Sequence, residues 1–231
     1  MKRKKLILFI VEGPTDENAL YPVMRSFFPD AIVKFHVAHG DLMLDADKSE
    51  DPLNLIRRIV AQERKRYGLK MSDILSVFEI IDTDGAFSGS SFVIYKEEAN
   101  KAEYTEDAIY TAHRLSFLQR NKKKSRNANI LSMARLLTDE IPYRLYYMSR
   151  NLEHALFNIT ESVSDNRKTN LSDHFSDEVR NHIAFISFLE KEGLVEKINY
   201  TQSWELINRN NESLKRHTNI YLLFEDFRYL S

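Results

Sequence analysis

The stretch from Leu6 to Leu20, LILFIVEGPTDENAL, decides how the N-terminal half of this chain folds. Its apolar start, Lys5–Val11, lacks alternation, which is the pattern of a strand buried on both faces of a parallel sheet. A Gly-Pro pair ends the strand, and we expect Thr15 to cap a helix with acidic residues in its first turn. The strand therefore presents a carboxylate, Glu12, at its carboxyl end.

The same alternation of strand and helix continues outward from this stretch. Apolar runs predict strands over Ile32–Ala38 and Ile74–Ile81, separated by an amphipathic helix over Pro52–Tyr67. A fourth strand is expected over Tyr143–Ser149. The β-α-β-α-β order predicts an α/β fold of Rossmann-like type, with a central, mostly parallel sheet flanked by helices.

The remaining segments carry weaker patterns. We predict a short strand at Phe92–Tyr95, a weak helix at Glu97–Ala112, a basic helical or loop insertion at Arg114–Arg135, a loop at Asn158–Asn170, helices at His174–Glu192 and Gln202–Asn211, and an apolar segment at Ile220–Phe227. The interpretation is a domain over residues 1–160 with an insertion at about 86–140. Residues 161–231 form a helical C-terminal extension that packs on the domain or forms a homo-oligomer contact.

Composition limits the classes of protein that this chain can represent. The 231 residues contain no cysteine, which excludes disulfides and thiolate metal sites and is consistent with a cytoplasmic protein. The start, MKRKKLILFIVEG, has too short an apolar run for a signal peptide, and no run approaches the roughly 20 residues of a membrane span. The net charge of −1 gives no general attraction to nucleic acid, although a local basic face could supply it.

Four carboxylates follow two of the predicted strands. Glu12 ends the first strand, Asp16 opens the helix after it, and Asp82 and Asp84 end the third strand. Ligands of parallel α/β sheets bind outside the carboxyl ends of the strands, so neighbouring strands would bring these side chains together. Close carboxylates repel one another unless a cation neutralises them, and oxygen ligands of this kind suit Mg²⁺ or Mn²⁺.

The motifs VEGPTDE and DTD, each at the end of a buried strand, resemble the TOPRIM domain. Topoisomerases, bacterial primases, ribosomal-RNA maturases and the overcoming-lysogenization-defect (OLD) nucleases share this domain. The resemblance covers roughly residues 5–85, and YYMSRNLEHALF at 146–157 is similar to a segment of RloB-type phage-defence proteins. The resemblance implies metal-assisted phosphodiester hydrolysis with these catalytic residues and metal ligands: Glu12, Asp16, Asp82 and Asp84. The resemblance also adds Glu153 as a further candidate site residue. Arg150 and His39 are added because each follows the carboxyl end of a predicted strand.

Among the TOPRIM classes, a nuclease fits this chain best. A primase would need a zinc-binding domain, which a chain without cysteine cannot supply, and a topoisomerase would need a second large domain. No phosphate-binding G-x-x-x-x-G-K-[ST] loop is present, so an ATPase would be a separate partner protein. The resemblance implies a Mg²⁺-dependent nuclease of phage or mobile-element defence (abortive infection). DNA and RNA both remain open as substrates.

The run from Arg114 to Arg135 contains seven basic and no acidic residues. It is either a solvated surface segment or an arm that contacts nucleic-acid phosphates. The candidate contacts are Arg120, Lys122, Lys123, Lys124 and Arg126.

Three alternatives stay open. The chain could be a metal-binding regulatory subunit that does not cleave but acts in a complex with an ATPase, or a housekeeping RNA-processing nuclease. Asp82-Thr83-Asp84-Gly85 also resembles the motif of haloacid-dehalogenase-type phosphatases. Against this, Ala86 replaces the expected threonine, the motif follows the third strand, and Glu12 would have no role.

Overall fold

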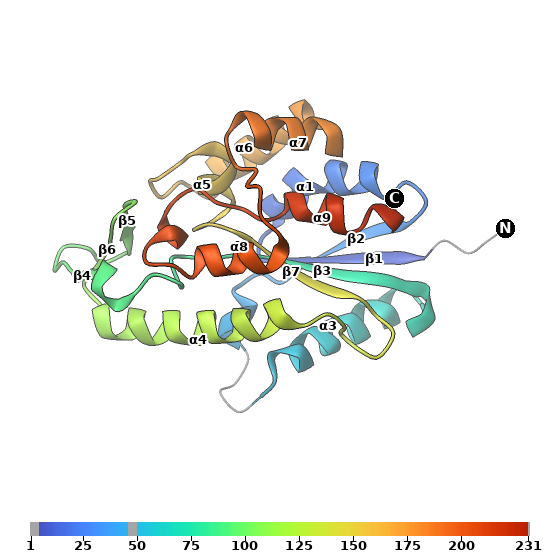
Figure 1. Cartoon of the computed structure of the whole chain (residues 1–231), viewed down its shortest axis with the longest axis horizontal. Coiled ribbons are helices and arrows are strands. Elements are labelled where there is room, and N and C mark those ends of the chain that lie inside the picture. The colour runs from blue at the N-terminus through green and yellow to red at the C-terminus, as the bar shows by residue number, and fades with distance from the viewer. Residues whose placement is uncertain (1–4, 46–49, 231) are drawn as a thin grey trace.

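A parallel four-stranded sheet lies at the centre of the molecule (Figure 1). The computed structural model describes residues 5–45 and 50–230; residues 1–4, 46–49 and 231 lie outside them. The strands are β1 (Leu6–Val11), β2 (Ile32–Val37), β3 (Ile74–Asp82) and β7 (Tyr143–Met148), in the order β2-β1-β3-β7. The predicted α/β class is confirmed. Because β1 and β3 are direct neighbours, their carboxyl ends meet.

Helices cover both faces of the sheet (Figure 1). One face carries α1 (Pro14–Phe27), α6 (Asp165–Glu178), α7 (His182–Lys191) and α9 (Tyr221–Asp226); the other carries α3 (Pro52–Arg66) and α4 (Arg114–Met133). Shorter helices are α2 (Leu42–Asp45), α5 (Leu152–Phe157) and α8 (Tyr200–Ile207). Phe224 of the C-terminal segment packs edge-on against Phe27, with ring centroids 5.0 Å apart. Residues 161–230 therefore share the core of the sheet.

Side chains of the C-terminal segment close the outer edge of β7. The Tyr200 hydroxyl donates to the Leu145 carbonyl (2.7 Å), and the Thr218 hydroxyl donates to the Tyr147 carbonyl (2.8 Å). The Tyr147 amide donates to the side-chain oxygen of Asn219 (2.9 Å). These bonds satisfy backbone groups that an edge strand would otherwise leave open for pairing with another strand.

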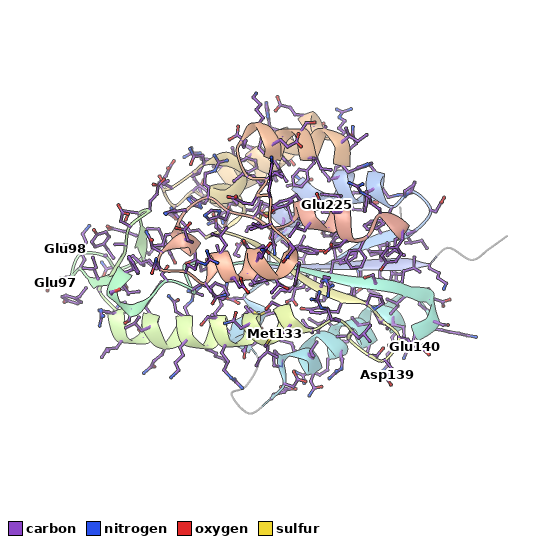
Figure 2. The ribbon with its side chains drawn as sticks, in the orientation of Figure 1. Glu97, Glu98, Met133, Asp139, Glu140 and Glu225 are labelled. Carbon is purple, nitrogen blue, oxygen red and sulfur yellow. The ribbon has the colours of Figure 1, made fainter. Side chains whose placement is uncertain are left out.

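A second, small sheet lies beyond the carboxyl end of the main sheet (Figure 1). It contains β4 (Val93–Tyr95), β5 (Glu103–Tyr104) and β6 (Ile109–Thr111), in the order β4-β6-β5. The predicted helix over Glu97–Ala112 is therefore wrong. Ile109 is buried against Leu214, while Glu97 and Glu98 lie in a turn at the outer tip (Figure 2). Strands of two or three residues are too short to show a period of two in the sequence.

Several helix boundaries differ from the expected ones because of local capping. Helix α1 begins at Pro14 with Gly13 as its cap, in place of Thr15, since proline suits the first helical position. The helix expected over His174–Glu192 is two helices, and Asn181 caps the second by accepting from the Ala184 amide (2.9 Å).

Two further helical segments were not predicted. Residues 158–170 are loop only up to Ser164, which caps α6, and the short helix α2 lies between β2 and α3. The basic segment, left open as helix or loop, is the 20-residue helix α4. Within residues 5–45 and 50–230, none of the helices combines the length and the apolar character that crossing a bilayer requires.

Candidate metal centre

The ends of β1 and β3 bring Glu12 and Asp84 together at one edge of the sheet. The Asp82 amide donates to a Glu12 carboxylate oxygen (3.2 Å), which ties the two strand ends to each other. Beyond β3 the chain turns through left-handed conformations at Asp84 (φ 47°) and Gly85 (φ 67°). The Asp84 amide donates to the Arg150 carbonyl (2.9 Å), so the loop after β7 helps to hold this turn.

A third carboxylate, Asp41, joins this pair from the loop after β2. One Asp41 oxygen accepts from the Met43 amide (3.0 Å) at the start of α2. Glu12, Asp41 and Asp84 each place a carboxylate oxygen within 4.8 Å of the others, so they could bind a metal ion. Sequence reasoning did not select Asp41. The available signal was that it follows the second strand at the edge where Glu12 and Asp84 lie.

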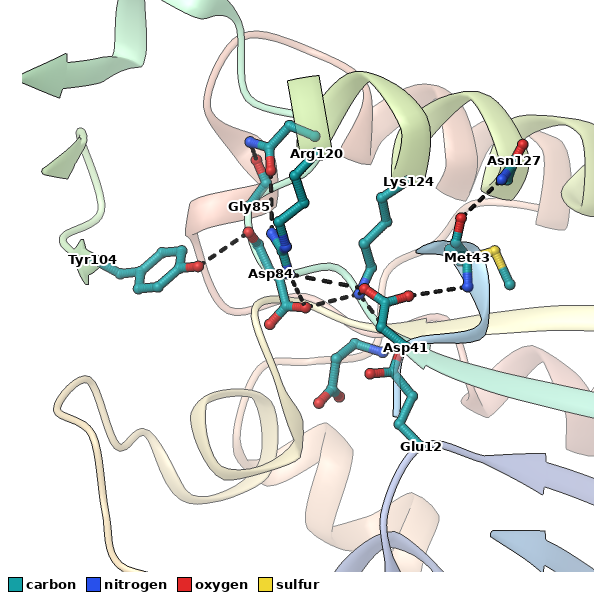
Figure 3. Close-up of polar contacts among 11 residues, drawn as sticks. Glu12, Asp41, Met43, Asp84, Gly85, Tyr104, Arg120, Lys124 and Asn127 are labelled. Carbon is teal, nitrogen blue, oxygen red and sulfur yellow. Dashed lines mark hydrogen bonds and ion pairs between the residues drawn. The ribbon is translucent and has the colours of Figure 1, made fainter. Parts of the chain in front are cut away.

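Lys124 of α4 closes the carboxylate cluster from the opposite side (Figure 3). Its ammonium lies 2.7 Å from Asp41, 2.8 Å from Asp84 and 3.4 Å from Glu12, and its side chain is 0% exposed. The neighbouring Arg120 guanidinium lies 2.6 Å from Asp84. Lys124 is a candidate nucleic-acid contact by sequence, but the structure places its buried ammonium among the three carboxylates.

Two asparagines of α4 fix Lys124 in place. Asn121 donates to the Gly85 carbonyl (3.1 Å), and Asn127 donates to the Met43 carbonyl (2.8 Å). These residues lie one turn before and one turn after Lys124, on the same face of the helix. The helix is thus bonded to both loops that carry Asp84 and Asp41.

The donor set fits a hard divalent cation. The cluster offers only carboxylate oxygens, which are the ligands that such cations prefer. The space among the Glu12, Asp41 and Asp84 oxygens already receives the Lys124 ammonium, whereas no hydrogen bond or ion pair to the Asp82 carboxylate is present among the described residues. An added ion would therefore bind toward Asp82.

The carboxylates of the cluster differ in the direction in which their pKa values are shifted. Burial raises the pKa of Glu12 to about 8; Lys124 opposes this rise, and Asp41 and Asp84 add to it. Burial and the charge of Glu12 hold the pKa of Asp82 well above its usual range. Burial also acts to raise the pKa of Asp84, but the Lys124 and Arg120 charges outweigh it and lower that pKa. Without a further cation Glu12 and Asp82 therefore favour the neutral carboxyl, and a cation bound beside them would favour their ionised form.

Asp16 and Glu153 form an acidic pair next to this cluster, and the Asp16 charge adds to the raised pKa values of Glu12 and Asp82. Asp16 accepts from the Gly13 amide (2.8 Å) and caps the turn after β1. Burial raises its pKa to about 6, and the Glu153 charge contributes to this rise. Glu153 is 4% exposed and lies 3.5 Å from Lys168. Neither residue belongs to the group formed by Glu12, Asp41 and Asp84.

Arg150 is a buried cation with unused donors beside this cluster. It is 6% exposed, adopts a left-handed backbone conformation (φ 56°) and stacks on the Tyr104 ring at 4.9 Å. One guanidinium nitrogen donates to the Thr160 carbonyl, but Nε and Nη1 have no hydrogen-bond partner among the described residues. Such donors are the type that binds phosphate oxygens.

The other basic candidates line a cavity beside α4, with Lys122 and Arg126 exposed and Arg120 also paired with Asp84. Arg120, Lys122, Lys123 and Arg126 line a cavity of about 820 Å³. Lys123 also donates to the Leu44 carbonyl. His39 is exposed and lines a different cavity of about 340 Å³ with His36 and Glu63.

Comparison of the chain with protein-family models, with curated proteins and with solved structures finds no significant match.

Proposed function

We propose that this protein is a Mg²⁺-dependent nuclease with a TOPRIM-like domain. The observation that carries the proposal is the convergence of four carboxylates, Glu12, Asp41, Asp82 and Asp84, at the carboxyl edge of a parallel sheet. A helix with a basic outer face stands directly beside these carboxylates. Carboxylates next to a surface that attracts phosphates are the arrangement that metal-assisted phosphoryl transfer requires.

Each residue of the centre has a role in this proposal. Glu12, Asp82 and Asp84 would hold the ion, Mg²⁺ or Mn²⁺, and Asp16 is the candidate for supporting it from the adjacent turn. When bound, the ion would stabilise negative charge on the phosphate and lower the pKa of a coordinated water. Glu12, whose pKa lies near 8, is suited to accept or return a proton near neutral pH.

Nucleic-acid phosphates would meet cations on two sides of the centre. Arg150, whose buried Nε and Nη1 have no protein partner, places a positive charge close to the carboxylates that would attract a phosphate. The exposed side chains of Lys122 and Arg126 would hold more distant phosphates along α4. Both sets act on the backbone of the polymer, so they fit DNA and RNA alike.

The biological setting of the proposal rests on the TOPRIM resemblance. It places the protein in the cytoplasm, in defence against phages or mobile elements, with a separate ATPase as partner and self-association as a further expectation. A neighbouring gene for an ATPase would favour such a two-component system.

Cleavage assays test the proposal. Labelled tRNA, total RNA, plasmid and single-stranded DNA are incubated with wild type, Glu12→Gln and the surface control Glu190→Gln, in Mg²⁺, Mn²⁺ or EDTA. We expect metal-dependent cleavage by wild type and Glu190→Gln, and loss of at least about 100-fold in Glu12→Gln. Equal cleavage by all three proteins, or cleavage in EDTA, would contradict the proposal.

A regulatory subunit without catalysis is the second candidate. Lys124 and Arg120 already neutralise much of the carboxylate charge, so the centre is stable without performing a reaction. This candidate predicts metal binding with no cleavage of any polymer.

The phosphatase alternative is tested in the same experiment by adding p-nitrophenyl phosphate as a substrate. It predicts that this monoester is hydrolysed by wild type and by Glu12→Gln alike.

A further inference from the structure

We infer that Lys124 is the permanent second cation of this centre, so that the centre takes a single divalent ion. The inference rests on the proposed metal dependence and adds the number of ions and the residue that sets it. Nucleases commonly place two metal ions about 4 Å apart, one on each side of the reacting phosphate. Here the Lys124 ammonium would occupy the position of one of those two ions.

The position of the ammonium is that of a bound ion. It lies within hydrogen-bond distance of both Asp41 (2.7 Å) and Asp84 (2.8 Å), and 3.4 Å from Glu12. These are the three residues whose carboxylate oxygens lie close enough together to share one cation. A metal ion and the ammonium cannot occupy this space together.

The burial of Lys124 and the contacts of α4 hold the ammonium at this position. Its side chain is fully buried, so it has no solvent-filled path into which to swing. The Asn121 and Asn127 bonds hold the helix against the Gly85 and Met43 carbonyls on either side. Moving the ammonium away would break its contacts with Asp41 and Asp84 and leave a charged group buried without partners, which is strongly unfavourable.

The charge balance also favours one ion. Glu12, Asp41 and Asp84 carry three negative charges when ionised, and Lys124 and Arg120 return two positive charges. When ionised, Asp82 adds one further negative charge, and its carboxylate forms no ion pair among the described residues. A single divalent ion beside Asp82 would bring the group to neutrality. A second ion would leave an excess of positive charge in a largely buried site.

Counting bound Mn²⁺ tests the inference. Mn²⁺ is titrated into the full-length protein, and free ion is followed by electron paramagnetic resonance and bound ion by calorimetry. The variants are Lys124→Met, which keeps the length of the side chain without its charge, and Lys191→Met, an exposed control on α7. We expect one ion in wild type and in Lys191→Met, and two ions in Lys124→Met.

The outcomes separate this inference from the proposed function. Two ions in wild type, or one ion in a folded Lys124→Met, would overturn the single-ion inference and leave the metal-dependent function intact. No ion in wild type would overturn the metal centre itself. If Lys124→Met does not fold, the spectrum of wild type saturated with Mn²⁺ decides. An isolated six-line signal is expected, whereas the signature of two coupled ions would overturn the inference.

Discussion

The Lys124 ammonium lies 2.7 Å from an Asp41 carboxylate oxygen, and this contact joins helix α4 to the loop after β2. Both residues lie outside the strands that supply Glu12 and Asp84. The geometry of the centre is therefore set from two directions: by strand ends within the sheet, and by a helix packed beside them.

Without metal, we expect the free energy of unfolding to fall as the pH rises. Burial raises the pKa of Glu12 from 4.5 to about 8, so folding favours the neutral carboxyl. This contribution is fully present below the unfolded pKa and is lost as the pH rises through about 8. Urea unfolding in EDTA at several pH values should show a shallower decline for Glu12→Gln than for wild type. Identical slopes would contradict the assignment.

We expect Asp41→Asn to weaken metal binding and to lower the pKa of Glu12. Asp41 is one of the charges that raise that pKa, and it positions Lys124. Calorimetry with Mn²⁺ should show a loss of affinity of at least about tenfold, since groups that orient metal sites typically contribute that much. Asp45→Asn, at an exposed position of α2, is the control and should bind as wild type does.

Gly85→Ala should destabilise the protein and reduce cleavage. Gly85 has φ +67°, and an added Cβ would lie 2.6 Å from Ile109 Cδ1 and 3.1 Å from Leu214 Cδ2. Gly68→Ala is the matched control, because Gly68 has φ +61° but nothing within 4 Å of the added atom. We expect the control to lose about 1–2 kcal/mol of unfolding free energy from backbone strain alone. Gly85→Ala should lose more, and equal losses would show that the contacts do not matter.

Reversing charge on the outer face of α4 should weaken nucleic-acid binding. The double change Lys122→Glu with Arg126→Glu should reduce affinity for all sequences similarly and lower the salt dependence by about two ion equivalents. Mn²⁺ binding should stay unchanged, because neither side chain touches the carboxylates. Lys191→Glu with Lys197→Glu, in the C-terminal segment, is the control. An unchanged salt dependence of binding would exclude this face as the contact.

The sequence allowed prediction of the residues that directly follow buried strands. Glu12, Asp82 and Asp84 end continuous apolar runs, and such runs mark strand ends clearly. Asp41 follows a strand of mixed exposure and a short loop, so the sequence did not show that it lies at the edge of the sheet. The inward role of Lys124 was hidden because α4 turns polar residues toward the centre: Asn121, Lys124 and Asn127. A run of basic residues cannot show which member points inward.

The bonds that close the outer edge of β7 also bear on how the chain could misassemble. A product that ended before Tyr200 would lose the three side chains that occupy this edge. The exposed strand could then pair with the same strand of another copy, which is the first step of edge-to-edge aggregation. The C-terminal segment thus protects the outer edge of β7 from pairing with the same strand of another copy during folding.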